Sequence, residues 1–159
     1  HLPQYQSAPP SASVATEDAS TLQFEQISLP DLQGTAQSLN QWQQPLLIVN
    51  FWAPWCAPCR REIPALIAAQ DAYPEQIKIV GLAFDSVENV REFATEHSIN
   101  YPMLVASAQS SRLSQFFGNQ SGGLPFTAIL NSERKIVFRH AGELHFDQIK
   151  SQIETILSH

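Results

Sequence analysis

The stretch that decides the fold is "VNFWAPWCAPCRREIPAL", residues 49–66, which contains both cysteines of the chain. Cys56 and Cys59 are separated by only two residues. An apolar run of strand length, residues 45–52, leads into them, and residues 57–72 after them have helix-forming composition. We therefore expect a central strand, buried on both faces, that turns into a helix at the cysteines.

Such a turn favours redox chemistry at Cys56. Unpaired backbone N–H groups converge at a helix N-terminus and the helix dipole is positive there, so both stabilise a thiolate. Cysteines at such sites have pKa values of about 3.5–7.5, against about 8.5 for a free thiol. Pro58 suits the first helical turn because its missing N–H costs nothing there. Cys59, one turn further on, is then placed to attack Cys56 once Cys56 is bound to a substrate sulfur.

Two other uses of the cysteines fit less well. A structural disulfide that closes such a small loop would stabilise the fold by only about 2 kcal/mol. A zinc site would need ligands such as His140 and His145, but compact zinc modules place their ligand pairs about 12–15 residues apart. These two histidines lie much further along the chain from the cysteines, and we expect both at the surface. We predict no metal, and no cofactor besides a redox-active Cys56–Cys59 disulfide.

Composition narrows the class of protein. The chain has 159 residues, the length of one domain, and its 43% hydrophobic residues are enough for a buried core. Nine basic against fifteen acidic side chains give a net charge of -6, and there is no basic run that could follow a phosphate backbone. Nucleic acid is therefore not expected as a partner. The longest apolar run, residues 46–49, is far shorter than the roughly 20 residues of a bilayer span.

The beginning of the chain differs from the rest. It starts with His1, which suggests that a signal peptide, a membrane anchor or more of the protein once preceded it. Residues 1–20 are rich in Pro, Ser and Ala and lack hydrophobic periodicity, so we predict a disordered linker there. This linker is either a tether that holds the domain off a membrane or a simple terminal tail. The folded domain is expected over residues 21–159.

The remaining elements alternate between strands and helices. The alternation in "TLQFEQISL" predicts a strand from about residue 22, in a hairpin with its turn near Gly34. Ser86 is the expected N-cap of one helix and Gly118 the expected end of another, while Pro64 should kink the helix after the cysteines. The other predicted elements are strands at 77–84 and 101–105, helices at 86–98, 107–118 and 145–157, and an antiparallel hairpin at 126–142.

The cysteine motif, with "GLPFTAIL" at residues 123–130, resembles the extracytoplasmic TlpA, ResA and CcmG branch of the thioredoxin superfamily. The resemblance runs from about residue 22 to the C-terminus. It implies an α/β, thioredoxin-like fold in which helices flank a central mixed sheet. It also implies an N-terminal β-hairpin, a central strand–helix insertion within residues 79–104, and a cis Leu124–Pro125 bond packed against the cysteines.

The same resemblance implies an activity. The protein is expected to be a thiol-disulfide oxidoreductase, periplasmic or otherwise extracytoplasmic, that acts on protein disulfides such as those of apocytochrome c cysteines. An upstream thiol donor, for instance a membrane reductase, would supply its electrons. Ala57 and Pro58 between the cysteines resemble the Gly-Pro of reducing thioredoxins, so we favour a reductase. Reductants and oxidants of this superfamily are well separated in reduction potential, because thioredoxin and the oxidant DsbA differ by about 150 mV, or roughly 7 kcal/mol.

The resemblance also assigns roles around the dithiol. Cytosolic thioredoxins carry a buried aspartate as proton acceptor where this chain has Asn50, whereas the extracytoplasmic branch has an acidic residue that Glu62 matches. Glu62 is therefore the expected proton acceptor, unless it is a solvated helix residue paired with Arg60 or Arg61. The residues expected to contact substrate are Trp55, Ala57, Pro58, Leu124 and Pro125, with Trp52 in the core.

Two other functions remain open from the sequence. A thiol peroxidase of the same superfamily would need a threonine three positions before its reactive cysteine, and Ala53 stands there. A redox-inert thioredoxin-fold binding module would not need the intact WCxPC sequence. Residues 119–121 match a glycosylation sequon, a pattern common by chance that carries little weight.

Overall fold

The computed structural model describes residues 22–159, and the predicted linker at residues 1–20 lies outside these described residues. A five-stranded sheet has the strand order β5-β4-β3-β6-β7. β3 pairs parallel with β4 and antiparallel with β6, which makes the sheet mixed, as predicted. The strands are β3 (Leu46–Trp52), β4 (Ile77–Ala83), β5 (Met103–Val105), β6 (Phe126–Leu130) and β7 (Ile136–Ala141).

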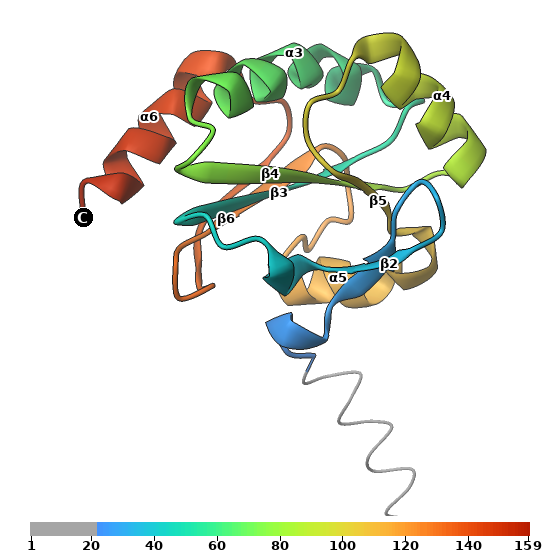
Figure 1. Cartoon of the computed structure of the whole chain (residues 1–159), viewed down its shortest axis with the longest axis horizontal. Helices are drawn as coiled ribbons and strands as arrows, with labels where there is room; N and C mark the ends of the chain where they lie inside the picture. The colour runs from blue at the N-terminus through green and yellow to red at the C-terminus, as the bar shows by residue number, and fades with distance from the viewer. Residues whose placement is uncertain (1–21) are drawn as a thin grey trace, which may run out of the picture.

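Helices cover both faces of this sheet (Figure 1). One face carries α3 (Ala57–Ala72), α4 (Val87–His97) and α6 (Phe146–Leu157), which pack with the sheet into one buried apolar cluster. The other face carries α5 (Ser110–Phe117) and the N-terminal segment, which form a second cluster. The result is the α/β thioredoxin-like fold, with both layers built around β3.

The side chains of β3 explain why this strand is central. All seven of its residues are buried, and alternate residues belong to the two different clusters. Leu46, Ile48 and Trp52 pack on the α3 side, whereas Leu47, Val49 and Phe51 pack on the α5 side. By the same alternation Asn50, the polar residue of the strand, lies on the α3 side, directly under the helix that follows the cysteines.

The N-terminal hairpin is present but shorter than predicted. β1 (Ser28–Pro30) and β2 (Ala36–Ser38) pair antiparallel, and the turn between them contains Gly34 with φ of 86°. The strand expected from residue 22 was wrong in its first part, because Phe24–Gln26 form a 3-10 turn. There the Gln26 side chain accepts a 2.9 Å hydrogen bond from the Gln23 N–H. This local bond competes with strand pairing.

The predicted helix ends agree with the structure. Ser86 caps α4 by accepting a 3.2 Å hydrogen bond from the Asn89 N–H, and Gly118 ends α5 with φ of 80°.

α3 is continuous from Ala57 to Ala72 with the exposed Pro64 inside it. Its buried face includes Cys59, Glu62, Ile63 and Leu66, so the site residues share the face that anchors the helix.

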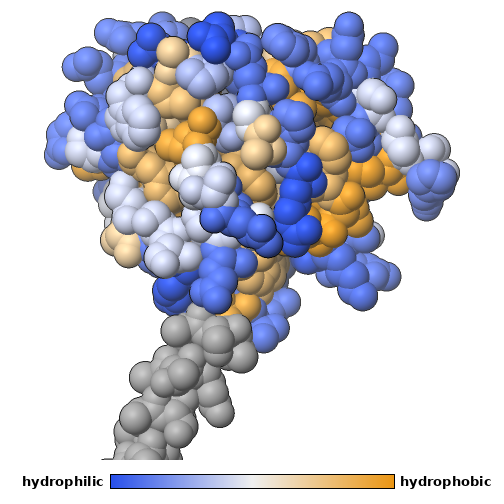
Figure 2. All heavy atoms as spheres, turned by 180° about the vertical axis from the view of Figure 1, so that it is seen from behind, coloured by the Kyte–Doolittle hydropathy of each residue, from blue (hydrophilic) through white to orange (hydrophobic). Residues whose placement is uncertain are grey.

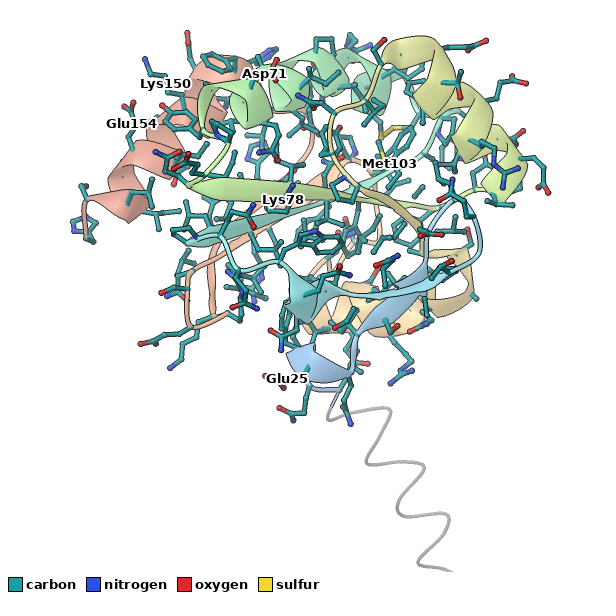
Figure 3. All side chains as sticks on the ribbon, viewed as in Figure 1. Glu25, Asp71, Lys78, Met103, Lys150 and Glu154 are labelled. Atoms are coloured by element: carbon teal, nitrogen blue, oxygen red, sulfur yellow. A yellow bond between two sulfur atoms is a disulfide. The ribbon has the colours of Figure 1, made fainter. Side chains whose placement is uncertain are left out.

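On the face opposite to that of Figure 1, hydrophilic side chains predominate around the rim and apolar side chains show between them near the middle (Figure 2). Asp71 on α3 and both Lys150 and Glu154 on α6 lie at the outside of the upper helical layer (Figure 3). Within the described residues, no helix combines the length and apolar character that crossing a bilayer requires.

Candidate active site

The two cysteines lie at the start of α3 and form a disulfide with a Cα–Cα distance of 5.2 Å. Cys56 is the N-cap residue, and its Sγ accepts a hydrogen bond of 3.3 Å from the Cys59 N–H. A sulfur at this position receives the free N–H groups and the positive end of the helix dipole, as the sequence indicated. Cys56 is 6% exposed and Cys59 1%, so the first cysteine is the more accessible one.

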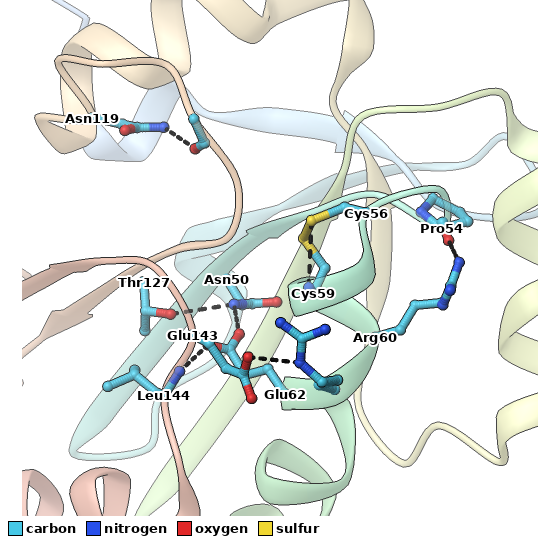
Figure 4. Close-up of a disulfide and its surroundings, with 12 residues drawn as sticks. Asn50, Pro54, Cys56, Cys59, Arg60, Glu62, Asn119, Thr127, Glu143 and Leu144 are labelled. Atoms are coloured by element: carbon cyan, nitrogen blue, oxygen red, sulfur yellow. Dashed lines mark hydrogen bonds and ion pairs between the residues drawn. A yellow bond between two sulfur atoms is a disulfide. The ribbon is translucent and has the colours of Figure 1, made fainter.

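The loop before the cysteines is held in place by the helix that follows them. The Arg60 guanidinium donates a 3.1 Å hydrogen bond to the Pro54 carbonyl, across the turn that contains Trp55 (Figure 4). Cys56 N–H also donates to the Ala53 carbonyl at 3.1 Å. These bonds fix the loop, yet Trp55 projects from it with 65% of its surface exposed, whereas Trp52 is fully buried. The predicted core and surface places of the two tryptophans are confirmed.

The residues predicted to contact substrate lie around the disulfide. Ala57 is exposed and Pro58 half-buried in the first turn of α3. The Leu124–Pro125 bond is cis, as the family resemblance implied, and Leu124 packs against the buried cluster that contains both cysteines. The cysteine loop and the loop before β6 are therefore neighbours in the fold, and contact of these residues with a substrate stays a prediction.

Glu62 lies one turn beyond Cys59 on the same buried face of α3 and is only 1% exposed. The Asn50 side-chain amide donates a 2.7 Å hydrogen bond to its Oε1 (Figure 4). The Leu144 backbone N–H donates another bond of 2.7 Å to its Oε2. The alternative of a solvated helix residue paired with Arg60 or Arg61 is therefore wrong.

Burial raises the pKa of Glu62 from its ordinary value of 4.5 to about 7. The two donated hydrogen bonds favour the carboxylate and limit the rise, while the negative charge of nearby Glu143 adds to it. Arg61 pairs with Glu143 at 3.0 Å and lies 61% exposed, away from the buried carboxylate. A carboxyl group with this pKa is half ionised near neutrality and can both accept and return a proton.

Two partners of Glu62 were not predicted as parts of the site. Asn50 was noted only as a replacement for aspartate, but its amide also donates to the Thr127 hydroxyl at 3.2 Å. Asn50 and Thr127 are directly opposite each other on β3 and β6. A polar residue inside each of two apolar strands could have indicated that Asn50 and Thr127 belong to the site. The sequence contains no signal for the contact of Leu144 with Glu62.

In the described part of the chain, no group of three or more His, Cys, Asp or Glu side chains is arranged to hold a metal ion. His145 is exposed at the start of α6, as predicted, whereas His140, also predicted at the surface, is half-buried on β7. The geometry suits thiol–disulfide exchange, with a nucleophile at a helix N-terminus, a resolving thiol and a buried base.

Known proteins resemble this chain in sequence and in fold. A family model described as the AhpC/TSA family matches residues 21–139. "Thioredoxin-like protein YneN" of Bacillus subtilis is 36% identical over 87 residues, which are 52% of this chain and 51% of that protein. "Thiol-disulfide oxidoreductase ResA" of Bacillus cereus is 26% identical over 129 residues, 79% of this chain and 72% of ResA. The chain therefore spans about half of the length of YneN and more of ResA.

A solved structure agrees more closely in length. The thioredoxin-related protein from Neisseria meningitidis serogroup B has a TM-score of 0.75 and 30% sequence identity to this chain. The match covers 82% of this chain and 99% of that protein.

Proposed function

Because the chain belongs to the AhpC/TSA family, as a TlpA/ResA-like member of the thioredoxin superfamily, it is a thiol-disulfide oxidoreductase, and we propose that it reduces disulfides of extracytoplasmic proteins. One observation supports the proposal most. Cys56 caps α3, and the buried Glu62 follows Cys59 on the same helix face with a pKa of about 7. A nucleophile and a proton acceptor for the resolving thiol are thus on one element.

The proposed reaction has two steps. The Cys56 thiolate attacks one sulfur of the substrate disulfide, a mixed disulfide forms, and the other substrate sulfur leaves as a thiolate that takes up a proton. Cys59 then passes its proton to the Glu62 carboxylate and attacks the Cys56 sulfur. The Cys56–Cys59 disulfide forms, and the second substrate sulfur is released as a thiolate. Two electrons have passed to the substrate, and an upstream thiol donor must restore the dithiol.

The reducing direction rests on the residues between the cysteines. Ala57 and Pro58 resemble the Gly-Pro of reducing thioredoxins, and Pro58 continues the helix without strain at its second position. Apocytochrome c cysteines before haem attachment are one substrate that fits this direction.

We propose a periplasmic or other extracytoplasmic location, with residues 1–20 as a tether and a membrane reductase as electron donor. The resemblance of residues 49–66 to the extracytoplasmic branch supports these assignments.

Two measurements, insulin reduction and a redox equilibrium with glutathione, test the activity and its direction. The reduced protein should cleave the interchain disulfides of insulin, and its equilibrium with a glutathione buffer should give a potential nearer to that of thioredoxin than of DsbA. Cys56→Ser should abolish the turnover. A potential close to that of DsbA would overturn the reducing direction but leave the exchange activity in place.

A peroxidase activity is the second candidate, because the matching family model bears the AhpC/TSA description. The residue three positions before Cys56 is Ala53, which is buried and has no hydroxyl to bind a peroxide oxygen. Incubation of the reduced protein with hydrogen peroxide and a thiol-regenerating system should therefore show no catalytic consumption of peroxide. Turnover comparable to that with insulin would favour the peroxidase.

A further inference from the structure

A groove with a cavity volume of about 610 Å³ lies beside the cysteine loop, on the α5 side of the sheet. Trp55, next to Cys56 in the chain, and Leu124, next to the cis proline, both line it, so the groove borders the loops that carry the redox site. Phe51 and Phe84 supply further apolar lining. Its volume lies within the range of about 300–1,000 Å³ that ligand pockets have. A polypeptide that presents a disulfide to Cys56 would extend into or past this groove.

One wall of the groove is a row of serine hydroxyls. Ser107, Ser110, Ser111 and Ser114 all line it, at the spacing that places residues on one side of a helix. The Ser107 hydroxyl donates a 3.1 Å hydrogen bond to the Asp85 carbonyl. Among the hydrogen bonds between described residues, none uses the hydroxyl of Ser110, Ser111 or Ser114. These three hydroxyls are available to a bound polar group.

The opposite wall, residues 119–123, is already formed. The buried Asn119 side chain donates a 3.0 Å hydrogen bond to the Gly123 carbonyl (Figure 4). Gly122 N–H donates back to the Asn119 carbonyl at 3.2 Å, and Gly123 N–H donates to the Ser121 hydroxyl at 3.2 Å. A loop closed by its own hydrogen bonds loses little further entropy when a ligand binds.

Among the described residues, those that line the groove include no ionisable side chain. Asp85 follows the lining residue Phe84 but does not line the groove, and its carboxylate Oδ1 accepts hydrogen bonds from the Ser86 N–H and the Asn89 side chain at the start of α4. Arg112 lies on α5 between lining serines and does not itself line the groove. A charged substrate side chain that entered this open groove would lose part of its hydration without gaining an opposite charge from the lining, which is unfavourable.

We propose that this groove is a specificity subsite, which accepts an uncharged substrate segment beside the reacting cysteine and disfavours Asp, Glu, Lys or Arg there. Serine hydroxyls can donate to and accept from hydroxyl and amide groups, and the aromatic lining suits an aromatic ring. The occupant is the polypeptide that carries the target disulfide. The proposal rests on the proposed reductase function and adds to it the chemical class of the sequence that surrounds the cysteine.

Matched peptides test the subsite. Each peptide has one internal disulfide with the same residue flanking both cysteines, which is Ser, Tyr, Asp or Lys. A second set carries Asp or Lys only at a distant end, so that net charge is matched. For the reduced protein, kcat/KM should be about tenfold higher for the Ser and Tyr peptides than for those with adjacent charges. The distant charges should have little effect.

Two variants with the same added charge provide the protein side of the test. Ser111→Glu places a carboxylate in the groove, whereas Gln115→Glu places one on α5 outside the lining. Ser111→Glu should raise the preference for Lys over Asp peptides by about tenfold, and Gln115→Glu should leave it unchanged. The rate of Gln115→Glu with hydroxyethyl disulfide, which has no side chains to place, should equal that of the wild-type protein.

The outcomes separate the two proposals. Equal kcat/KM values for all flanking residues would overturn the subsite while leaving the reductase intact. The same preference change in Ser111→Glu and Gln115→Glu would also overturn it, because a general charge effect would then explain the data. Failure of the wild-type protein to reduce any peptide or hydroxyethyl disulfide would overturn the reductase function, and the subsite with it.

Discussion

Asn50 and Glu62 join the central strand to the catalytic helix through a buried hydrogen bond of 2.7 Å between their side chains. Asn50 is the polar residue of an otherwise apolar strand, and Glu62 is fully buried one turn beyond Cys59. The amide can only donate to the carboxylate and cannot take its proton. In the proposed mechanism, proton transfer at this position is the role of Glu62, so the first three predictions concern its carboxyl group.

Removing the base should slow the resolving step. Glu62→Gln keeps the size and polarity of the side chain but leaves Cys59 without a nearby proton acceptor. We expect the release of substrate from the mixed disulfide to slow by roughly 10²-fold, within the range of general-base catalysis. The initial attack by Cys56 should change less. Rapid-mixing kinetics with a fluorescent disulfide peptide can measure both steps, and an unchanged rate of release between pH 6 and 8 would exclude this role.

Burial of Glu62 should also affect stability. Its folded pKa, about 7, exceeds its ordinary value of 4.5, so between these values the folded state holds a proton that the unfolded chain has lost. The free energy of unfolding should therefore fall as pH rises through this window, by up to about 3 kcal/mol in total, and this contribution is fully present below pH 4.5. Urea unfolding of oxidised wild-type protein and Glu62→Gln, compared across this range, should show a flatter dependence in the variant. Parallel curves would contradict the prediction.

Replacing Glu143 should change the pKa of Glu62 by a small amount. Its negative charge helps to raise the pKa of Glu62, so Glu143→Gln should lower that pKa by about a few tenths of a unit. The exposed pair with Arg61 is lost as well, at a cost of about 0–1 kcal/mol. A carboxyl-carbon NMR titration of Glu62 measures the pKa directly. Glu96→Gln on the exposed surface of α4 is the control, and a rise of the pKa in Glu143→Gln would show the assignment of charges to be wrong.

The two cysteines should differ in trapping experiments. Cys56 is the N-cap of α3 and the more exposed sulfur, so its thiolate should make the first attack. Cys59→Ser should accumulate mixed disulfides with substrate, because nothing resolves them, whereas Cys56→Ser should accumulate none. Non-reducing gels after reaction with an oxidised substrate protein distinguish the two. Adducts through Cys59 would reverse the order.

Gly81 should not tolerate a side chain. A Cβ at this position would lie 2.5 Å from the Met103 Sδ and 3.0 Å from the Trp52 Nε1. Gly81→Ala should therefore lower the free energy of unfolding by about 1–3 kcal/mol, as overpacking of a core does. Gly123→Ala is the matched control, since its Cβ would meet only the Ser121 hydroxyl at 3.5 Å. Equal losses in both variants, measured by denaturant unfolding, would show that the contact at Gly81 is relieved.

Local sequence patterns were enough for much of the fold. The apolar run of β3, the cap at Ser86 and the end at Gly118 each depend on a few neighbouring residues, and the structure has them as predicted. The Phe24–Gln26 turn was missed because an apolar alternation in a short segment does not exclude a local side-chain hydrogen bond. Glutamine capping its own turn gives no periodic signal.

The site was only partly predictable, for a different reason. The dithiol and Glu62 lie on one helix, so motif spacing brings them together. The partners of Glu62 come from elsewhere, since Leu144 lies 82 residues further along the chain. Thr127 meets Asn50 across 77 residues, which only the pairing of β3 with β6 decides. Ser111 and Ser114 look like ordinary polar residues of a surface helix until the loop at 119–123 is placed opposite them.

The hydrogen bond from Asn119 to Gly123 has a consequence for producing the protein. Residues 119–121 form an N-x-S sequon, but the Asn119 amide is engaged and the residue is only 4% exposed. An oligosaccharyltransferase needs this nitrogen free, so the folded domain is closed to it. A sugar could be attached only to the unfolded chain, and it would then keep this loop from closing. When the protein is secreted from a eukaryotic host, the Asn119 amide can therefore either be glycosylated or form the hydrogen bond that closes this loop, but not both.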